Sequence, residues 1–148
     1  IKQDILPGLK SRAFRRRVRI GPHDTRCNRP LAGGGICEEE ETLIHFFTCP
    51  EIRSTFDKLK HIILSFTENE NRFPPVTDIQ FLLGDFSSSK TKLCTGIWAL
   101  YVVLHKIYVL KNEDTPVVFE SVWNWAKGDI RIANLCRNGK KLDETIFD

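Results

Sequence analysis

With 148 residues, the chain has the length of one domain and is large enough to bury a core of its own. Its net charge of +3 is modest, no uninterrupted apolar stretch of about 18 residues is present, and no signal peptide opens the sequence, so we expect no membrane span and no membrane partner. The cysteine count of five is odd and favours zinc or free thiols in a reducing, intracellular compartment over a disulfide framework.

Basic residues gather at the start of the chain. Residues 1–29 hold nine Lys or Arg and two Asp, a net charge of +7, whereas the remaining residues hold 13 basic and 17 acidic groups, a net charge of −4. Apolar positions are spaced for one face of a helix, which predicts a basic helical segment over residues 1–26. Because guanidinium groups bind phosphate through paired hydrogen bonds, the outward face predicts a nucleic-acid surface made of Lys10, Arg12, Arg15, Arg16, Arg19 and Arg26.

Two other interpretations of these cations stay open. They could line a solvated helix face, or they could pair with the acidic run Glu38–Glu41 that follows in the sequence.

Residues 27–49 gather four soft metal ligands. Nine residues separate Cys27 from Cys37, seven separate Cys37 from His45, and three separate His45 from Cys49. Three thiolates and one imidazole suit a structural zinc ion, Zn²⁺, in a tetrahedral shell. His45 and Cys49 are four apart, so one helical turn would place both on the same face. The sequence therefore predicts a zinc module made of Cys27, Cys37, His45 and Cys49.

The same letters allow other interpretations. Buried cysteines and a chance His–Cys pair would give this pattern, and the first spacing is wider than that of most zinc fingers. His23 lies four residues before Cys27 and could replace one of the four ligands, although a loop histidine is the simpler interpretation.

Helices separated by clear breaks are predicted after the module. A short helix over residues 42–48 follows the glutamate run, and Pro50 begins a second helix whose apolar stripe is Ile52, Phe56, Leu59, Ile63 and Phe66. The loop over residues 67–78 contains Pro74 and Pro75. The run 79–83 is too short to separate a strand from a helical turn.

Two long helices are predicted in the C-terminal half. The first spans residues 90–111, is apolar on more than one side, and contains Gly96, which permits a close approach. The second opens with Thr115 as cap and Pro116 as first residue, and its predicted core face is Val118, Phe119, Val122, Trp123, Ala126, Ile130, Ala133 and Leu135. Cys94 and Cys136 are predicted to be buried core residues, and residues 139–148 a frayed end.

The predicted fold class is mainly α: a small helical domain with one structural zinc module of Cys-Cys-His-Cys type and room for one short strand. The predicted organisation is a basic helical segment over residues 1–26, the zinc module over residues 27–49, and a helical domain over residues 50–148 packed on the module. Together they would form a single compact domain.

The run from Cys37 to Pro50, CEEEETLIHFFTCP, resembles the zinc-binding segment near the C-terminus of non-LTR (LINE-type) retrotransposon reverse transcriptases. The surroundings are similar too: a basic helix before the run, an amphipathic helix after it, the sequence Phe-Leu-Leu-Gly at 81–84, and a long apolar helix. The resemblance spans residues 5–140, approximately. Here residues 29–36 form an apparent insertion, and three residues, where the family usually has four, separate His45 from Cys49.

The resemblance implies a nucleic-acid-binding C-terminal domain that positions element RNA or target DNA for target-primed reverse transcription. Its expected partners are RNA or DNA and the remainder of the parent reverse-transcriptase polypeptide, and its expected location is intracellular and nuclear. We expect the chain, which lacks methionine and begins with Ile1, to be a piece of such a longer protein. The paired aspartates of a polymerase are not recognisable in the sequence, so we expect no catalytic site here. The alternative from a different class is a zinc-stabilised protein-docking domain without direct nucleic-acid contact.

Overall fold

The computed structural model describes residues 26–67, 73–86 and 90–148. The chain divides into two compact units, Ile1–Phe56 and Asp57–Asp148, and the described part of the first begins at Arg26. Within the described ranges there are five α-helices and one 3₁₀-helix, and the only β-type pairing consists of two isolated bridges. The prediction of a mainly α fold is therefore confirmed. The predicted domain boundaries remain predictions.

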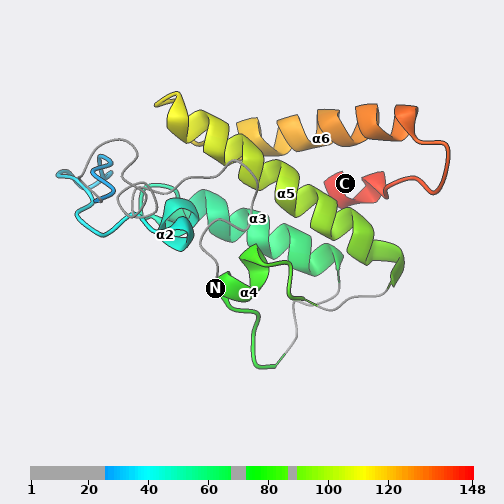
Figure 1. The fold of residues 1–148 in the computed structure, drawn as a ribbon, viewed down its shortest axis with the longest axis horizontal. Helices are drawn as coiled ribbons and strands as arrows, with labels where there is room; N and C mark the ends of the chain where they lie inside the picture. Colours follow the sequence, from blue (N-terminus) through cyan, green and yellow to red (C-terminus); the bar gives the residue numbers. More distant parts are fainter. Residues whose placement is uncertain (1–25, 68–72, 87–89) are drawn as a thin grey trace, which may run out of the picture. The chain divides into compact units, whose positions relative to one another are not determined.

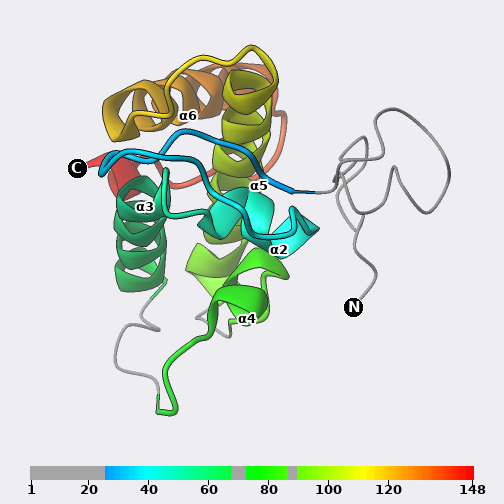
Figure 2. The same cartoon turned by 90° about the vertical axis from the view of Figure 1, so that its left-hand side faces the viewer.

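The first unit contains a hairpin over residues 26–40, the short helix α2 (Leu43–Thr48), and the beginning of α3 (Arg53–Phe66). Figure 2 shows the two arms of this hairpin running side by side before the chain enters α2. Thr42 caps α2, because its hydroxyl accepts a hydrogen bond from the backbone N–H of His45 at 3.1 Å. The predicted short helix is thus present, and its start is set by an ordinary threonine cap.

Helix α3 presents the predicted apolar stripe. Ile52, just before the helix, and Phe56, Leu59 and Ile63 are buried, while Phe66 is half-buried. Pro50 lies in the turn that precedes α3, where the N–H of Ile52 donates to the carbonyl oxygen of Cys49 at 2.9 Å. The turn separates α2 from α3 without an intervening loop.

The short run that the sequence left ambiguous is a helix, α4 (Asp78–Leu82). Thr77 and Gln80 form a reciprocal capping box at its start, with both hydrogen bonds present at 3.0 and 3.2 Å. This pair of side chains decides between a strand and a helical turn, which the apolar run alone could not do.

Helix α5 (Lys90–Asn112) is the longest element of the described chain and runs beside α6 (Phe119–Cys136) (Figure 1). Gly96 lies against Thr67: a Cβ atom at this glycine would come within 2.5 Å of the Thr67 methyl carbon. The predicted close approach is therefore present. By length and composition alone, the window Lys92–Asn112 could also cross a membrane, but the core helix of a soluble protein passes the same test.

Helix α6 begins later than predicted. Val118 is its N-terminal boundary residue and makes no side-chain cap, whereas Thr115 and Pro116 lie in the segment before the helix. The predicted core face is right at Val122, Ala126 and Ile130, but Val118 and Leu135 are exposed. Asn134 is buried and Leu135 is not, because Asn134 continues the four-residue spacing from Ala126 and Ile130.

The prediction of a frayed C-terminal end is wrong. Leu142 and Ile146 are buried, and residues Glu144–Phe147 form a 3₁₀-helix, η1, that folds back beside α6 (Figure 1). Asn134 anchors the segment through two hydrogen bonds to the backbone of Leu142, at 2.8 and 2.9 Å. A polar residue on the core face of α6 thus holds a tail in which half of the residues, over 139–148, are charged.

Candidate metal centre

A hydrogen-bonded hairpin brings Cys27 and Cys37 together. The N–H of Asn28 donates to the carbonyl oxygen of Cys37, and the N–H of Cys37 donates to the carbonyl oxygen of Arg29, each at 2.8 Å. Gly34 and Gly35 form the tip with φ values of +96° and +73°, a region that L side chains rarely adopt. The wide spacing between these cysteines is therefore spanned by the two arms and the tip of a hairpin.

Helix α2 supplies the other two candidate ligands. His45 lies in its first turn, and Cys49 is its C-terminal boundary residue. Because the two are four positions apart, both side chains reach the same face of this short helix. The cap at Thr42 fixes where the helix starts and so places His45 in its first turn.

The four ligand atoms all lie within 4.8 Å of one another. The Sγ atoms of Cys27 and Cys49 are 3.6 Å apart, and the Cys37 Sγ is 3.4 Å from the His45 Nε2. Tetrahedral zinc, with Zn–S of about 2.3 Å and Zn–N of about 2.0 Å, requires S···S and S···N separations of roughly 3.8 and 3.5 Å. These two separations therefore fit the edges of a tetrahedral site, and 3.6 Å is far from a disulfide bond length of about 2.05 Å.

All four side chains are buried, with exposed fractions of 1% for Cys27, 3% for Cys37, 8% for His45 and 0% for Cys49. Burial, above all other causes, raises the pKa of the Cys27 thiol from its ordinary 9.0 to about 12. The neighbouring Cys49 and the charge of Glu41 also raise it, and a hydrogen bond with the backbone of Arg29 lowers it. Without a cation, this sulfur is a neutral thiol, whereas a bound metal ion would stabilise the thiolate.

Charged groups lie around the cluster. The Glu39 Oε2 is 3.0 Å from the His45 Nδ1, and the Arg29 Nε is 4.0 Å from the Glu51 Oε2. Glu39 was not singled out from the sequence, since it is one of four consecutive glutamates and nothing in the run distinguishes it.

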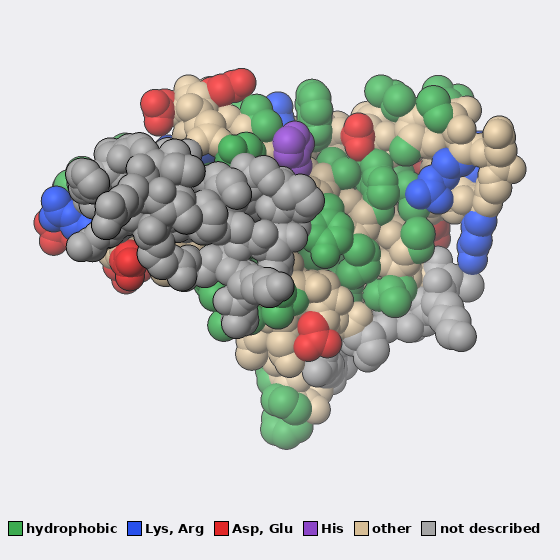
Figure 3. All heavy atoms as spheres, in the orientation of Figure 1, with side chains coloured by type: hydrophobic (Ala, Val, Ile, Leu, Met, Phe, Trp, Pro, Cys, Tyr) green, Lys and Arg blue, Asp and Glu red, His purple; other side chains and the backbone are tan. Residues whose placement is uncertain are grey.

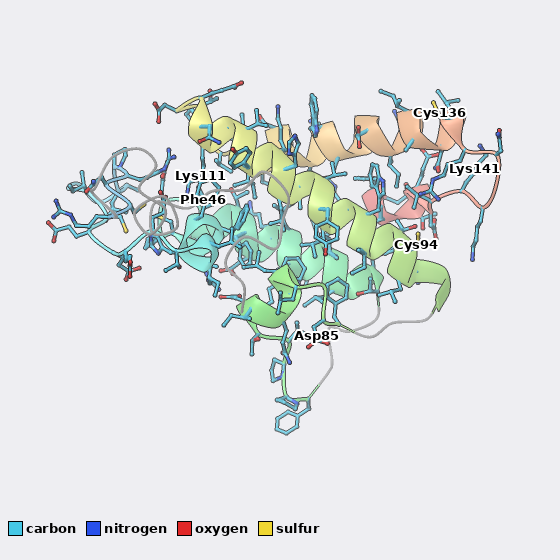
Figure 4. All side chains as sticks on the ribbon, viewed as in Figure 1. Phe46, Asp85, Cys94, Lys111, Cys136 and Lys141 are labelled. Carbon is cyan, nitrogen blue, oxygen red and sulfur yellow. The ribbon has the colours of Figure 1, made fainter. Side chains whose placement is uncertain are left out.

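The prediction that the remaining two cysteines are buried is wrong. Cys94 on α5 and Cys136 at the end of α6 were expected in the core, but both are exposed (Figure 4). Each occupies a helix face that its neighbours do not cover, so burial separates the three cluster cysteines from the other two.

The predicted nucleic-acid residues fall mostly outside the described ranges. Five of these residues lie in the part of the chain that the structure does not describe: Lys10, Arg12, Arg15, Arg16 and Arg19. The alternative ligand His23 lies in the same part. Arg26 is described: it is exposed, and its backbone forms a bridge with Glu40 at the open end of the hairpin.

Comparisons with models of known families, with curated protein sequences and with solved structures found no match to this chain. What defines the protein is therefore its own structure: a mainly helical chain with a buried group of three cysteines and one histidine that could hold a metal ion.

Proposed function

We propose that Cys27, Cys37, His45 and Cys49 bind one zinc ion, and that the zinc-stabilised chain is a nucleic-acid-binding domain. The observation that supports the zinc site is the buried group of four ligand atoms, two of whose separations suit a tetrahedral ion. Four protein ligands leave no open position, so the ion is structural and not catalytic.

The ion has a clear physical task in this proposal. The hairpin over residues 26–40 and helix α2 are short elements, and each supplies two ligands. An ion shared between them joins the two in a way that their own small apolar surface could not.

The metal part of the proposal is tested by loading the protein with Co²⁺, whose absorption reports tetrahedral thiolate coordination. The wild-type protein should show intense sulfur-to-cobalt charge-transfer bands, which Zn²⁺ then displaces. Replacing Cys37 by serine should remove them, whereas replacing the exposed Cys94 by serine should not. A wild-type spectrum without charge-transfer bands would overturn the proposed site.

The nucleic-acid part rests on the concentration of charge in residues 1–29 and on the resemblance to retrotransposon reverse transcriptases. In this proposal the arginines bind phosphates and position element RNA or target DNA without reading its sequence. The domain would act within a reverse transcriptase, in the nucleus, during target-primed reverse transcription. Binding should therefore weaken steeply as the salt concentration rises.

A charge-reversal experiment tests this part. Replacing Arg15, Arg16 and Arg19 by glutamate should abolish binding to labelled RNA and DNA and leave the fold unchanged. The matched control carries the same change of charge at Arg131, Arg137 and Lys140, near the other end of the chain, and should retain most of the affinity. If the variant with glutamate at positions 15, 16 and 19 binds RNA and DNA as tightly as the wild type does, nucleic-acid binding by residues 1–29 is overturned.

The exposed face of α6 favours protein docking as a second candidate function. Its residues alternate in steps of three and four, the spacing of a seam that packs against another helix, and all are exposed: Val118, Ser121, Trp125, Gly128, Ile132 and Leu135. Figure 3 shows hydrophobic side chains standing on α6, at the upper right. The occupant would be an amphipathic helix of the parent polypeptide. Replacing Ile132 and Leu135 by glutamate should then abolish association with that polypeptide and leave nucleic-acid affinity unchanged; unchanged association would contradict docking.

A further inference from the structure

The geometry points to Glu39 as the positioning residue of the metal centre: its carboxylate accepts the Nδ1 proton of His45, so that Nε2 is presented to the ion. The inference rests on the proposed zinc site and assigns to one member of the glutamate run a role of its own.

The two nitrogens of the His45 ring face different partners. Nε2 is 3.4 Å from the Cys37 Sγ and so points into the ligand group. Nδ1 is 3.0 Å from the Glu39 Oε2, a hydrogen-bond distance. A neutral imidazole carries a single N–H, and a metal ligand must offer the nitrogen that lacks it. An acceptor at Nδ1 therefore selects the tautomer whose Nε2 can bind the metal.

Glu39 is also fixed by the hairpin. Its carbonyl oxygen accepts a hydrogen bond from the backbone N–H of Cys27 at 2.8 Å. One residue thus contacts two candidate ligands, Cys27 through its backbone and His45 through its side chain. These two contacts keep the Glu39 carboxylate next to the Nδ1 atom of the His45 ring.

The size of the effect is limited by solvent. The Glu39 side chain is 71% exposed, so water can partly replace it as the Nδ1 partner. Loss of such a partner typically costs 10–100-fold in metal affinity, and we expect the lower end, about tenfold.

The test measures zinc affinity by competition with a chromophoric chelator. Replacing Glu39 by alanine should weaken binding about tenfold, and replacing it by glutamine, which keeps a neutral acceptor oxygen, should weaken it less. Glu38→Ala is the matched control, since Glu38 is an exposed neighbour in the same run, and should bind zinc as the wild type does.

A spectroscopic readout separates positioning from a general loss of stability. In the zinc-bound wild type, ¹⁵N NMR of the ring should show Nε2 bound to metal and an Nδ1–H protected from exchange with water. Glu39→Ala should lose that protection, and Glu38→Ala should keep it. Equal zinc affinity and equal protection in the two alanine variants would overturn the role of Glu39 and leave the proposed zinc site standing. A wild-type protein that holds no zinc would overturn the proposed site and this inference with it.

Discussion

The Sγ atoms of Cys27 and Cys49 lie 3.6 Å apart although 22 positions separate the two residues in the chain. One comes from the first arm of a hairpin and the other from the end of α2. Two thiols held at this distance without a disulfide bond, with a third thiol and an imidazole beside them, form the arrangement that a tetrahedral metal ion stabilises.

Alkylation of the five cysteines should divide them into two groups. In the metal-loaded protein, iodoacetamide should modify the exposed Cys94 and Cys136 quickly and leave Cys27, Cys37 and Cys49 intact, because burial and metal coordination both block a thiolate's attack. Mass spectrometry counts the adducts. After removal of the metal by a chelator and unfolding in denaturant, which removes both kinds of protection, the three protected cysteines should react as well. Equal rates at all five before chelation would contradict the site.

The metal-free protein should lose stability as the pH rises above 9. The pKa of Cys27 is raised in the folded state to about 12, so between pH 9 and 12 the unfolded chain has lost this proton and the folded chain still holds it. Unfolding is then favoured as the pH rises, by up to about 1.4 kcal/mol per pH unit. The stabilisation from the neutral thiol is fully present below pH 9.

Denaturant titrations of the metal-free wild type and of Cys27→Ser isolate this residue. The serine hydroxyl does not titrate in this range, so the free energy of unfolding should fall less steeply with pH in the variant than in the wild type. Parallel slopes would show that the Cys27 pKa is the same in the folded and unfolded chains.

Replacing Gly96 by alanine should lower the free energy of unfolding by about 1–3 kcal/mol, a cost typical of an added methyl in a packed interior. The new Cβ would come within 2.5 Å of the Thr67 methyl carbon, and Thr67 is fully buried. Thermal or denaturant melts give the difference.

Gly128→Ala is the matched control. Gly128 lies on the exposed face of α6, and a Cβ atom added there would have no neighbouring atom within 4 Å, so alanine should raise stability by up to about 1 kcal/mol through helix propensity. If Gly96→Ala leaves the free energy of unfolding unchanged or raises it, as Gly128→Ala should, the close packing at Gly96 is wrong.

Asn134→Ala should release the C-terminal segment. The side chain makes both hydrogen bonds to the Leu142 backbone, and its loss leaves those buried groups without partners, at a cost of about 1–3 kcal/mol. Hydrogen exchange should become faster at residues 142–148, while Asn138→Ala, at an exposed position, should leave it unchanged. Figure 4 shows Lys141 beside the end of α6, where its ammonium donates to the Asn134 carbonyl oxygen at 2.6 Å.

Much of the fold follows from patterns in the sequence. Apolar spacing predicted the helices that became α3 and α5, and the Thr42 cap lies where the predicted short helix begins. Spacing failed where polar side chains decide the structure. Thr77 and Gln80 turn an ambiguous run into α4, and Asn134 fixes a charged tail that composition alone marks as loose.

The candidate site, too, contains residues that the sequence predicts and contacts that it does not. The identities of Cys37, His45 and Cys49 follow from short-range spacing. That Cys27 joins them depends on a hairpin whose cross-strand hydrogen bonds leave no sequence periodicity. The contact of Glu39 with His45 depends on the direction of one side chain in a run of four identical residues, which no sequence pattern specifies.

The most direct test of the central claim is the zinc content of the purified protein, determined by elemental analysis and paired with thermal melts with and without a chelator. One zinc per chain, with a melting temperature that falls sharply on chelation, is the predicted result. No zinc and an unchanged melting temperature would contradict a structural metal centre at Cys27, Cys37, His45 and Cys49.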